Sequence, residues 1–175
     1  IIADEKLVFV GSSPIGGDLI TKDIATILGI NIGLAEKIKN LNSSLFISPI
    51  EEREIIKYRL QDSTSPESSM IRITRLELRD IIQSRLEELF EAVKTSLEKS
   101  KIPYSLMPNI VITGGVASIL GIDKLVSEIF NKNAKIGYPT KFSSAPPEII
   151  NPTNSCALGM LENPNVNRDD GAARV

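Results

Sequence analysis

The chain contains no histidine, and Cys156 is its only cysteine. A zinc site, a histidine-based catalytic triad and a disulfide framework all need residues that are missing, so we expect none of these sites. No apolar run approaches the roughly 20 residues that span a bilayer, and we expect no signal peptide. A lone cysteine that we expect to be buried suits a reducing compartment, and we therefore predict a cytoplasmic protein.

Basic residues are not in excess either, because 20 Lys and Arg stand against 22 Asp and Glu, a net charge of −2. Without a long basic run, we expect no nucleic acid partner. Hydrophobic residues make up 42% of the 175 residues, which is enough for one ordinary globular domain or two small ones. The chain begins at Ile1 without an initiator Met, and we expect it to start inside a longer protein.

Strands and helices alternate in the outer parts of the chain, which predicts an α/β sheet core with a small α/β insertion in the middle. We expect Asp18 to cap the first helix and Gly29 to end it. Polar composition predicts a surface loop at 62–69 and a frayed tail at 163–175. Predicted strands cover residues 7–10, 45–50, 55–60, 71–73, 109–113 and 135–139, and predicted helices cover residues 18–28, 31–41, 75–99, 121–130 and 153–161.

The longest predicted helix has the clearest pattern. Thr74 and Glu77 have the spacing of a capping box, in which each side chain accepts a hydrogen bond from the backbone of the other residue. Apolar residues then recur every three or four positions towards Lys99, and Pro103 prevents any continuation. This stripe consists of Leu78, Ile82, Leu86, Leu89, Val93 and Leu97.

Three short elements carry candidate chemistry. A predicted buried strand at 110–112 runs into Gly114-Gly115, where backbone without a Cβ lets a ligand approach closely. Glu36 and Lys39 share one helix face, where they could accept from sugar hydroxyls and pack against a base. The loop at 14–17 opens a helix, and amides at a helix start favour anions. Each element also has a plain explanation, as a tight turn, a solvated ion pair or a simple helix entry.

The order and spacing of these elements resemble the actin-like ATPase superfamily and, within it, the FtsA family. The family pattern GG-x-x-(I/V)-T-x-D-I-A is matched at residues 16–25, and A-E-x-x-K at residues 35–39. An apolar strand ending in T-G-G-x-A is matched at residues 110–117, followed by Leu120-Gly121-Ile122. Residues 135–139 are similar to the family's R-I-G-x-P, and residues 157–161 to its A-x-G-L-L helix.

The resemblance implies a fold and a division of the chain. The fold would be α/β, an actin-like (ribonuclease H-like) subdomain IIA with a small inserted α/β subdomain IIB. Subdomain IIA would consist of residues 1–41 and 101–163, and subdomain IIB of residues 42–100. Residues 164–175 would form a flexible tail.

The resemblance also implies ATP with Mg²⁺ in the intact protein. Glu36 and Lys39 would contact the ribose and adenine. The family's D-x-G-x-G-T phosphate loop is absent from this sequence, so we expect the chain alone to bind no nucleotide and to hydrolyse none. No catalytic residue and no metal ligand is assigned. The remaining nucleotide-binding residues would be Gly16, Gly17, Gly114, Gly115, Val116 and Ala117.

The partners implied are those of cell division. Subdomain IIB would dock the acidic C-terminal tail of the ring protein FtsZ, and a solvated helix face balanced by Glu87 and Glu88 stays open as the alternative. The family likeness further implies self-association into filaments, contacts with other division proteins, and a place at the cytoplasmic face of the inner membrane at the division site. The membrane contact would be made by a segment missing here. The candidate docking residues are Arg72, Arg75, Arg79 and Arg85.

Two other interpretations stay open. A pilus-assembly actin-like protein of the PilM type shares the diglycine and A-E-x-x-K elements, although the insertion around residues 81–88 looks more like FtsA. A pure interaction module, in which the glycines only form turns, would bind no nucleotide. The nucleotide hypothesis requires that the helix bearing Glu36 and Lys39 and the turn at Gly114-Gly115 converge on one cleft.

Overall fold

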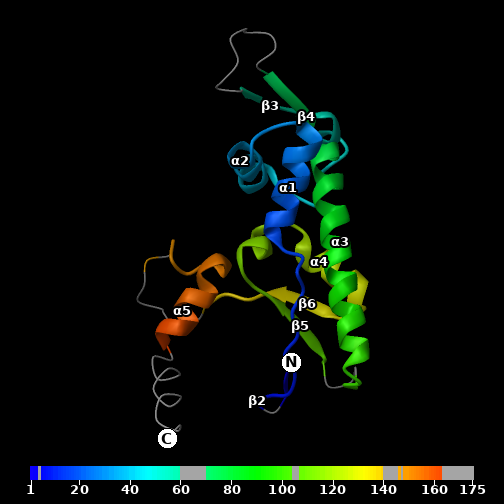
Figure 1. Cartoon of the computed structure of the whole chain (residues 1–175), viewed down its shortest axis with the longest axis vertical. Helices are drawn as coiled ribbons and strands as arrows, with labels where there is room; N and C mark the ends of the chain where they lie inside the picture. Colours follow the sequence, from blue (N-terminus) through cyan, green and yellow to red (C-terminus); the bar gives the residue numbers. More distant parts are fainter. Residues whose placement is uncertain (4, 60–69, 104–106, 140–145, 147, 163–175) are drawn as a thin grey trace, which may run out of the picture.

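The computed structural model describes residues 1–3, 5–59, 70–103, 107–139, 146 and 148–162. Helices and small sheets are arranged along one long helix, α3, which runs through most of the length of the molecule in Figure 1. Helices α1, α2 and α4 and strands β3 to β6 lie around it, and α5 stands to one side. The helices are α1 (Gly17–Leu28), α2 (Ile32–Asn42), α3 (Arg75–Lys99), α4 (Ile122–Phe130) and α5 (Ser155–Glu162).

The described strands form three separate pairs. Strands β1 (Ile2–Ala3) and β2 (Lys6–Leu7) are antiparallel, as are β3 (Ile55–Arg59) and β4 (Met70–Thr74). Strands β5 (Asn109–Ile112) and β6 (Asn133–Ile136) are parallel, with α4 in the connection between them. Short 3₁₀ helices complete the structure: η1 (Glu51–Arg53), η3 (Gly115–Ser118) and η4 (Pro152–Asn154).

The structure confirms the prediction for helix α3. The backbone N–H of Glu77 donates to the Thr74 hydroxyl at 3.1 Å, and the backbone N–H of Thr74 donates to the Glu77 carboxylate at 2.8 Å, so the capping box is complete. Of the predicted stripe, the first three members are fully buried and the last three are half-buried. Helix α3 therefore contributes most to the core in its first half.

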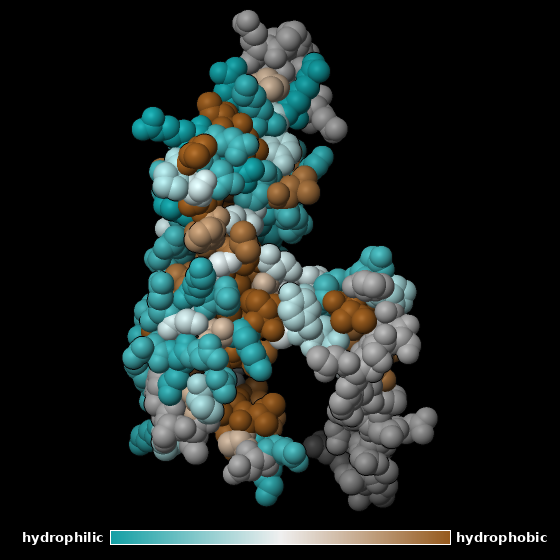
Figure 2. Space-filling view, turned by 180° about the vertical axis from the view of Figure 1, so that it is seen from behind, coloured by the Kyte–Doolittle hydropathy of each residue, from teal (hydrophilic) through white to brown (hydrophobic). Residues whose placement is uncertain are grey.

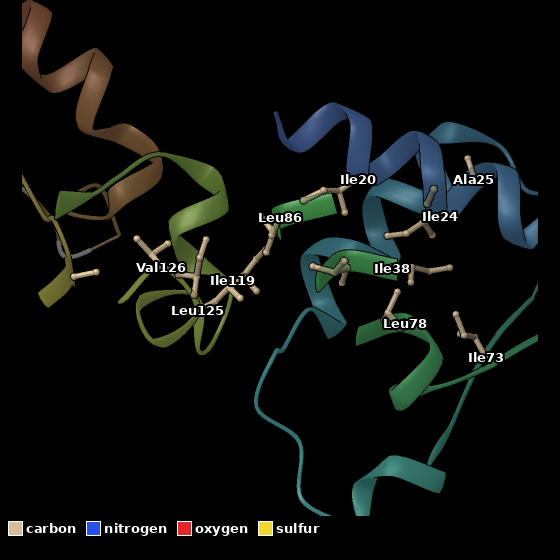
Figure 3. Packing of buried hydrophobic residues seen from close by; sticks show 14 of the residues in the cluster. Ile20, Ile24, Ala25, Ile38, Ile73, Leu78, Leu86, Ile119, Leu125 and Val126 are labelled. Carbon is tan, nitrogen blue, oxygen red and sulfur yellow. The ribbon is translucent and has the colours of Figure 1, made fainter. Parts of the chain in front are cut away.

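The hydrophobic core is continuous from α4 to the β3–β4 pair. In Figure 3, side chains of α4 and of the turn before it lie on one side, and side chains of α1, α2 and β4 lie on the other, with Leu86 of α3 between them. Burial of this apolar surface is the main favourable term that holds α3 against both groups. The cluster contains Ile20, Ile24, Ala25, Ala35, Ile38, Ile73, Leu78, Ile82, Leu86, Ile119, Ile122, Leu125, Val126, Phe130 and Ala134.

The first two helices differ in detail from the prediction. Asp18 does not cap α1, because the N-cap is Gly16 and Asp18 lies in the first turn. Gly29 ends α1 as predicted, with a φ of 63° that favours glycine. Ile27 on α1 and Leu41 on α2 are apolar but exposed, since each of these helices packs through one narrow face.

The strand predicted at 45–50 is wrong. The backbone N–H of Leu45 donates to the carbonyl of Leu120 at 2.8 Å, and the chain then turns towards η1. The cause lies in Ser48 and Glu51, because the Ser48 N–H donates to the Glu51 carboxylate at 2.9 Å and the Glu51 N–H donates to the Ser48 hydroxyl at 3.4 Å. This reciprocal pair starts a helical turn instead of a strand.

Other local predictions need correction. The strand at 7–10 is reduced to Lys6–Leu7, and the strand predicted at 135–139 is β6 at Asn133–Ile136. Strand β5 is not buried on both faces, because Val111 is 56% exposed while Ile110 and Ile112 pack against the core. Cys156, expected to be buried, is exposed.

The surface is mainly hydrophilic. Figure 2 shows hydrophobic side chains gathered in separate patches from the upper to the lower part of the face seen from behind. No helix in the described ranges is both long and apolar enough to cross a bilayer. The predicted loop at 62–69 and the tail at 163–175 lie outside the described residues. The division into residues 1–41, 42–100 and 101–163 stays a prediction.

Candidate functional site

A cleft of about 580 Å³ opens between α1, α2 and the turn that follows β5. The helix bearing Glu36 and Lys39 forms one wall, and the diglycine turn forms the other. The predicted convergence of these two elements therefore holds in the structure. The cleft is lined by Gly17, Asp18, Glu36, Lys39, Asn40, Ser43, Gly115, Val116, Ser118, Ile119 and Thr153.

The α2 wall is ordered by a polar network. The Lys39 ammonium donates to the Glu36 carboxylate at 2.7 Å and to the Thr21 hydroxyl at 2.8 Å. The Thr21 hydroxyl donates to the same Glu36 oxygen. Thr21 belongs to α1 and is only 3% exposed, so the network joins the two helices from beneath the cleft.

This network acts on the charge of Glu36. The hydrogen bond from Lys39, followed by that from Thr21, lowers the pKa of the Glu36 carboxyl below its ordinary value, against a smaller opposing effect of burial. A carboxylate that accepts several hydrogen bonds is stabilised in its charged form. Glu36 is therefore an anionic acceptor at neutral pH, and its side chain is 43% exposed towards solvent.

The opposite wall is held by Thr113, which ends the strand at the glycine pair. Its hydroxyl lies 2.7 Å from the hydroxyl of Ser155 and 3.3 Å from the carbonyl of Pro152. The backbone N–H of Gly114 also donates to the Pro152 carbonyl, at 2.9 Å. Gly114 has a φ of 93°, which favours glycine at this position. The turn is thus fixed against η4, whose Thr153 completes the cleft.

Gly17, the first residue of α1, lies close to the turn that follows β5. A Cβ added to Gly17 would lie 3.0 Å from a methyl carbon of Val116 and 3.7 Å from the Lys39 nitrogen. A Cβ added to Gly115 would meet only the methyl group of Thr153, at 4.0 Å. Residue 17 therefore has little room for a side chain, whereas residue 115 leaves open space for a ligand.

The eight predicted nucleotide-binding residues divide into two groups. Five of them line the cleft, namely Gly17, Glu36, Lys39, Gly115 and Val116. Gly16, Gly114 and Ala117 do not line it, and Ala117 is buried with 4% exposure. The role of all eight residues in nucleotide binding stays a prediction.

Sequence reasoning missed several residues of the cleft. Asn40 on α2 and Ser43, the C-cap of α2, follow Glu36 at four and seven residues, so helical spacing alone could have placed them on the same face. Thr153 had no comparable signal, because it reaches the cleft through the contact between η3 and η4. The other missed lining residues are Asp18, Ser118 and Ile119.

The four candidate docking arginines lie on β4 and α3. Arg72 is exposed and faces Lys57 across the β3–β4 pair. The other three are in ion pairs: Arg75 with Glu54 at 2.6 Å, Arg79 with Asp80 at 2.7 Å, and Arg85 with Asp23 at 2.6 Å and Glu88 at 2.5 Å. Docking of an acidic tail to them stays a prediction.

In the part of the chain that the structure describes, protein side chains alone form no candidate metal site. No group of three or more His, Cys, Asp or Glu side chains lies there in an arrangement that could hold a metal ion.

Comparison with known proteins gives a consistent match. The sequence model of the family "Cell division protein FtsA" matches residues 1–159. FtsA of Borreliella burgdorferi is 35% identical over 155 residues, which are 87% of this chain and 36% of that protein. FtsA of Rhizobium meliloti is 28% identical over 169 residues, which are 95% of this chain and 37% of that protein. The chain thus spans about a third of the length of these curated relatives.

Solved structures match the fold. The crystal structure of MreB 5 of Spiroplasma citri bound to AMPPNP superimposes with a TM-score of 0.67 and 23% identity, over 91% of this chain and 46% of that one. The same protein bound to ADP gives a TM-score of 0.61 and 22% identity, over 85% and 43%. The predicted α/β actin-like fold is thereby confirmed.

Proposed function

The chain belongs to the FtsA family of cell-division proteins, and we propose that it supplies one half of the ATP site of a longer actin-like protein. The observation that carries this proposal is the cleft between the Glu36–Lys39 face of α2 and the Gly115 turn. Its volume of about 580 Å³ lies within the range of about 300–1,000 Å³ typical of small-molecule sites. The nucleotides in the two MreB 5 structures support ATP as the ligand.

Each side of the cleft suits a different part of a nucleotide. Glu36 offers an anionic acceptor for a sugar hydroxyl, and the open space at Gly115 lets a ligand reach the backbone. Helix α1 begins at Gly17, which lines the cleft, and the backbone N–H groups at the start of a helix favour phosphates. We propose that Mg²⁺ accompanies ATP in the whole protein, and that the other half of that protein closes the cleft.

The wider role follows from the family. We propose residues 42–100 as subdomain IIB and as the docking site for the FtsZ tail. Self-association into filaments and contacts with other division proteins belong to the same proposal, as does a place at the cytoplasmic face of the inner membrane. The FtsA match over residues 1–159 supports this assignment over a pilus-assembly role.

The test is a titration of the whole protein with a fluorescent ATP analogue. We expect Gly115→Asp to weaken binding more than tenfold, because a carboxylate would fill the space beside Thr153 and repel the phosphates. Gly159→Asp is the matched control, since a Cβ there meets nothing within 4 Å and Gly159 does not line the cleft.

Equal affinity of the Gly115→Asp variant and the unaltered protein would refute the assignment of this turn. If the unaltered protein binds no ATP at all, the nucleotide proposal fails and the interaction module is left as the alternative.

A further inference from the structure

Several chain segments meet at the hydroxyl group of Thr113, the residue directly before the diglycine turn. We propose that this junction, formed by Thr113, Gly137, Pro152 and Ser155, holds the turn in the shape that the ligand needs, and that Thr113 and Ser155 are positioning residues. The inference rests on the proposed nucleotide function for the identity of the ligand. Its geometric part, the fixing of the turn by the junction, stands without that function.

The junction gives a role to a motif that the cleft leaves unexplained. Gly137 belongs to the motif at residues 135–139, and none of these residues lines the cleft. Its backbone N–H donates to the carbonyl of Ile112 at 2.8 Å, and its own carbonyl lies 3.1 Å from the Thr113 hydroxyl. A Cβ added to Gly137 would lie 2.5 Å from a methyl carbon of Val111. The missing side chain therefore lets this segment follow β5 closely to its end.

The hydrogen bonds of the junction have one arrangement that satisfies every group. The Thr113 hydroxyl has a single proton and can also accept, whereas carbonyl oxygens only accept. Its proton therefore goes to the Gly137 carbonyl, because the Pro152 carbonyl is farther away at 3.3 Å and already accepts from the Gly114 N–H. The Ser155 hydroxyl, 2.7 Å away, then donates to the Thr113 oxygen. Thr113 thus ties α5, which stands to one side in Figure 1, to the ends of β5 and β6.

The junction also sets the spacing of two residues of the cleft. Gly115 follows Thr113 by two residues and Thr153 precedes Ser155 by two, and both Gly115 and Thr153 line the cleft. Glycine has access to more backbone conformations than other residues, so a diglycine turn needs outside contacts to hold a single shape. The junction supplies such contacts on both sides of the turn's first glycine, Gly114, whose N–H donates to the Pro152 carbonyl at 2.9 Å.

The fixing of the turn can be tested on this chain without any ligand, by NMR hydrogen exchange of isotope-labelled glycine amides. The Gly114 N–H is protected by its bond to the Pro152 carbonyl. We expect Thr113→Val, which keeps the shape and removes the hydroxyl, to speed the exchange of this amide about threefold or more. Thr113→Ser should restore the slow exchange. Thr95→Val is the matched control, because Thr95 is exposed on α3 and does not line the cleft.

Ser155→Ala should speed the exchange of the Gly114 amide as well. Its matched control is Ser84→Ala, since Ser84 is exposed on α3 and bonds a carbonyl of its own helix. The same Gly114 exchange in Thr113→Val and the unaltered chain would overturn the role of the junction. If Thr113→Val does not fold, the comparison of Ser155→Ala with Ser84→Ala decides.

The ligand part is tested by a titration of the whole protein with a fluorescent ATP analogue. Thr113 is exposed, so water replaces part of a lost hydrogen bond, and Thr113→Val should weaken binding by about threefold to tenfold. Thr113→Ser and Thr95→Val should bind as the unaltered protein does. Because Thr113 and Ser155 act through the same turn, the losses in Thr113→Val and Ser155→Ala should not add in the double variant.

Equal affinity of Thr113→Val and the unaltered protein, or losses that add fully, would overturn the positioning role for the ligand. Absence of ATP binding to the unaltered protein would refute the proposed function, while the exchange of the Gly114 amide would still decide whether the junction fixes the turn.

Discussion

The contact between Gly17 and Val116 gives a direct test of how closely the walls of the cleft approach. An added Cβ at Gly17 would lie 3.0 Å from a Val116 methyl carbon, about 0.5–1 Å closer than carbon atoms prefer. Overpacking of this kind costs about 1–3 kcal/mol. We therefore expect Gly17→Ala to lower the free energy of unfolding and to weaken ATP binding by displacing Val116 into the cleft.

The control for this variant is Gly159→Ala, because a Cβ there meets nothing within 4 Å and the residue lies inside α5. Alanine is preferred over glycine in a helix by about 1 kcal/mol, so Gly159→Ala should be slightly stabilising. In urea unfolding, the free energies of unfolding of the two variants should differ by about 2–4 kcal/mol, the sum of the overpacking cost and the helix preference of alanine. Adding Val116→Ala to Gly17→Ala removes the methyl groups in contact and should recover ATP affinity. Equal free energies of unfolding for Gly17→Ala and Gly159→Ala, or no recovery of ATP affinity in the double variant, would refute the close approach of Gly17 to Val116.

Three further predictions concern stability and partners. Leu86→Ala should cost about 2–5 kcal/mol in urea unfolding, because Leu86 is fully buried where α3 meets both halves of the core; a cost below about 1 kcal/mol would contradict this packing. Since the fold lowers the pKa of Glu36, its contribution to stability is present above the unfolded-state pKa and is lost as the pH falls through the folded-state pKa. Glu36→Gln should therefore reduce the fall in the free energy of unfolding at acid pH, and an unchanged pH dependence would contradict the lowered pKa. Reversing Arg79 and Arg85 to Glu should weaken binding of an acidic FtsZ-tail peptide in calorimetry, and an unaffected isotherm would remove the docking proposal.

Elements with strong local signals were predicted well. The capping box at Thr74 and Glu77 and the apolar stripe after it gave α3 its correct bounds, because both signals depend on residues within one helix. The strand at 45–50 failed although its residues are apolar enough. There, the reciprocal hydrogen bonds of Ser48 and Glu51 decide the backbone path, and this pair is as local as the box that was recognised.

The candidate site was predictable only in part, since its residues come from several elements. Glu36 and Lys39 were found from their spacing on one helix, and Gly115 from the end of a strand. The importance of Thr21 has no such signal, because its partners are on another helix, 15 and 18 residues away. Thr153 likewise enters the cleft through packing of η3 against η4.

A surface ion pair on a helix is ordinarily worth little, because water screens it and both side chains lose freedom. The Glu36–Lys39 pair departs from that case for a reason visible only in three dimensions. Thr21, 3% exposed on the neighbouring helix, places a hydroxyl beside the ion pair and binds both of its charged groups. Burial of that hydroxyl is unfavourable unless it is hydrogen-bonded, and here its hydrogen bonds to Lys39 and Glu36 offset the cost only while both partners stay in place. Orientation of Glu36 towards the cleft is therefore coupled to the packing of α1 on α2, and a change that separates these helices should loosen the carboxylate before any ligand is present.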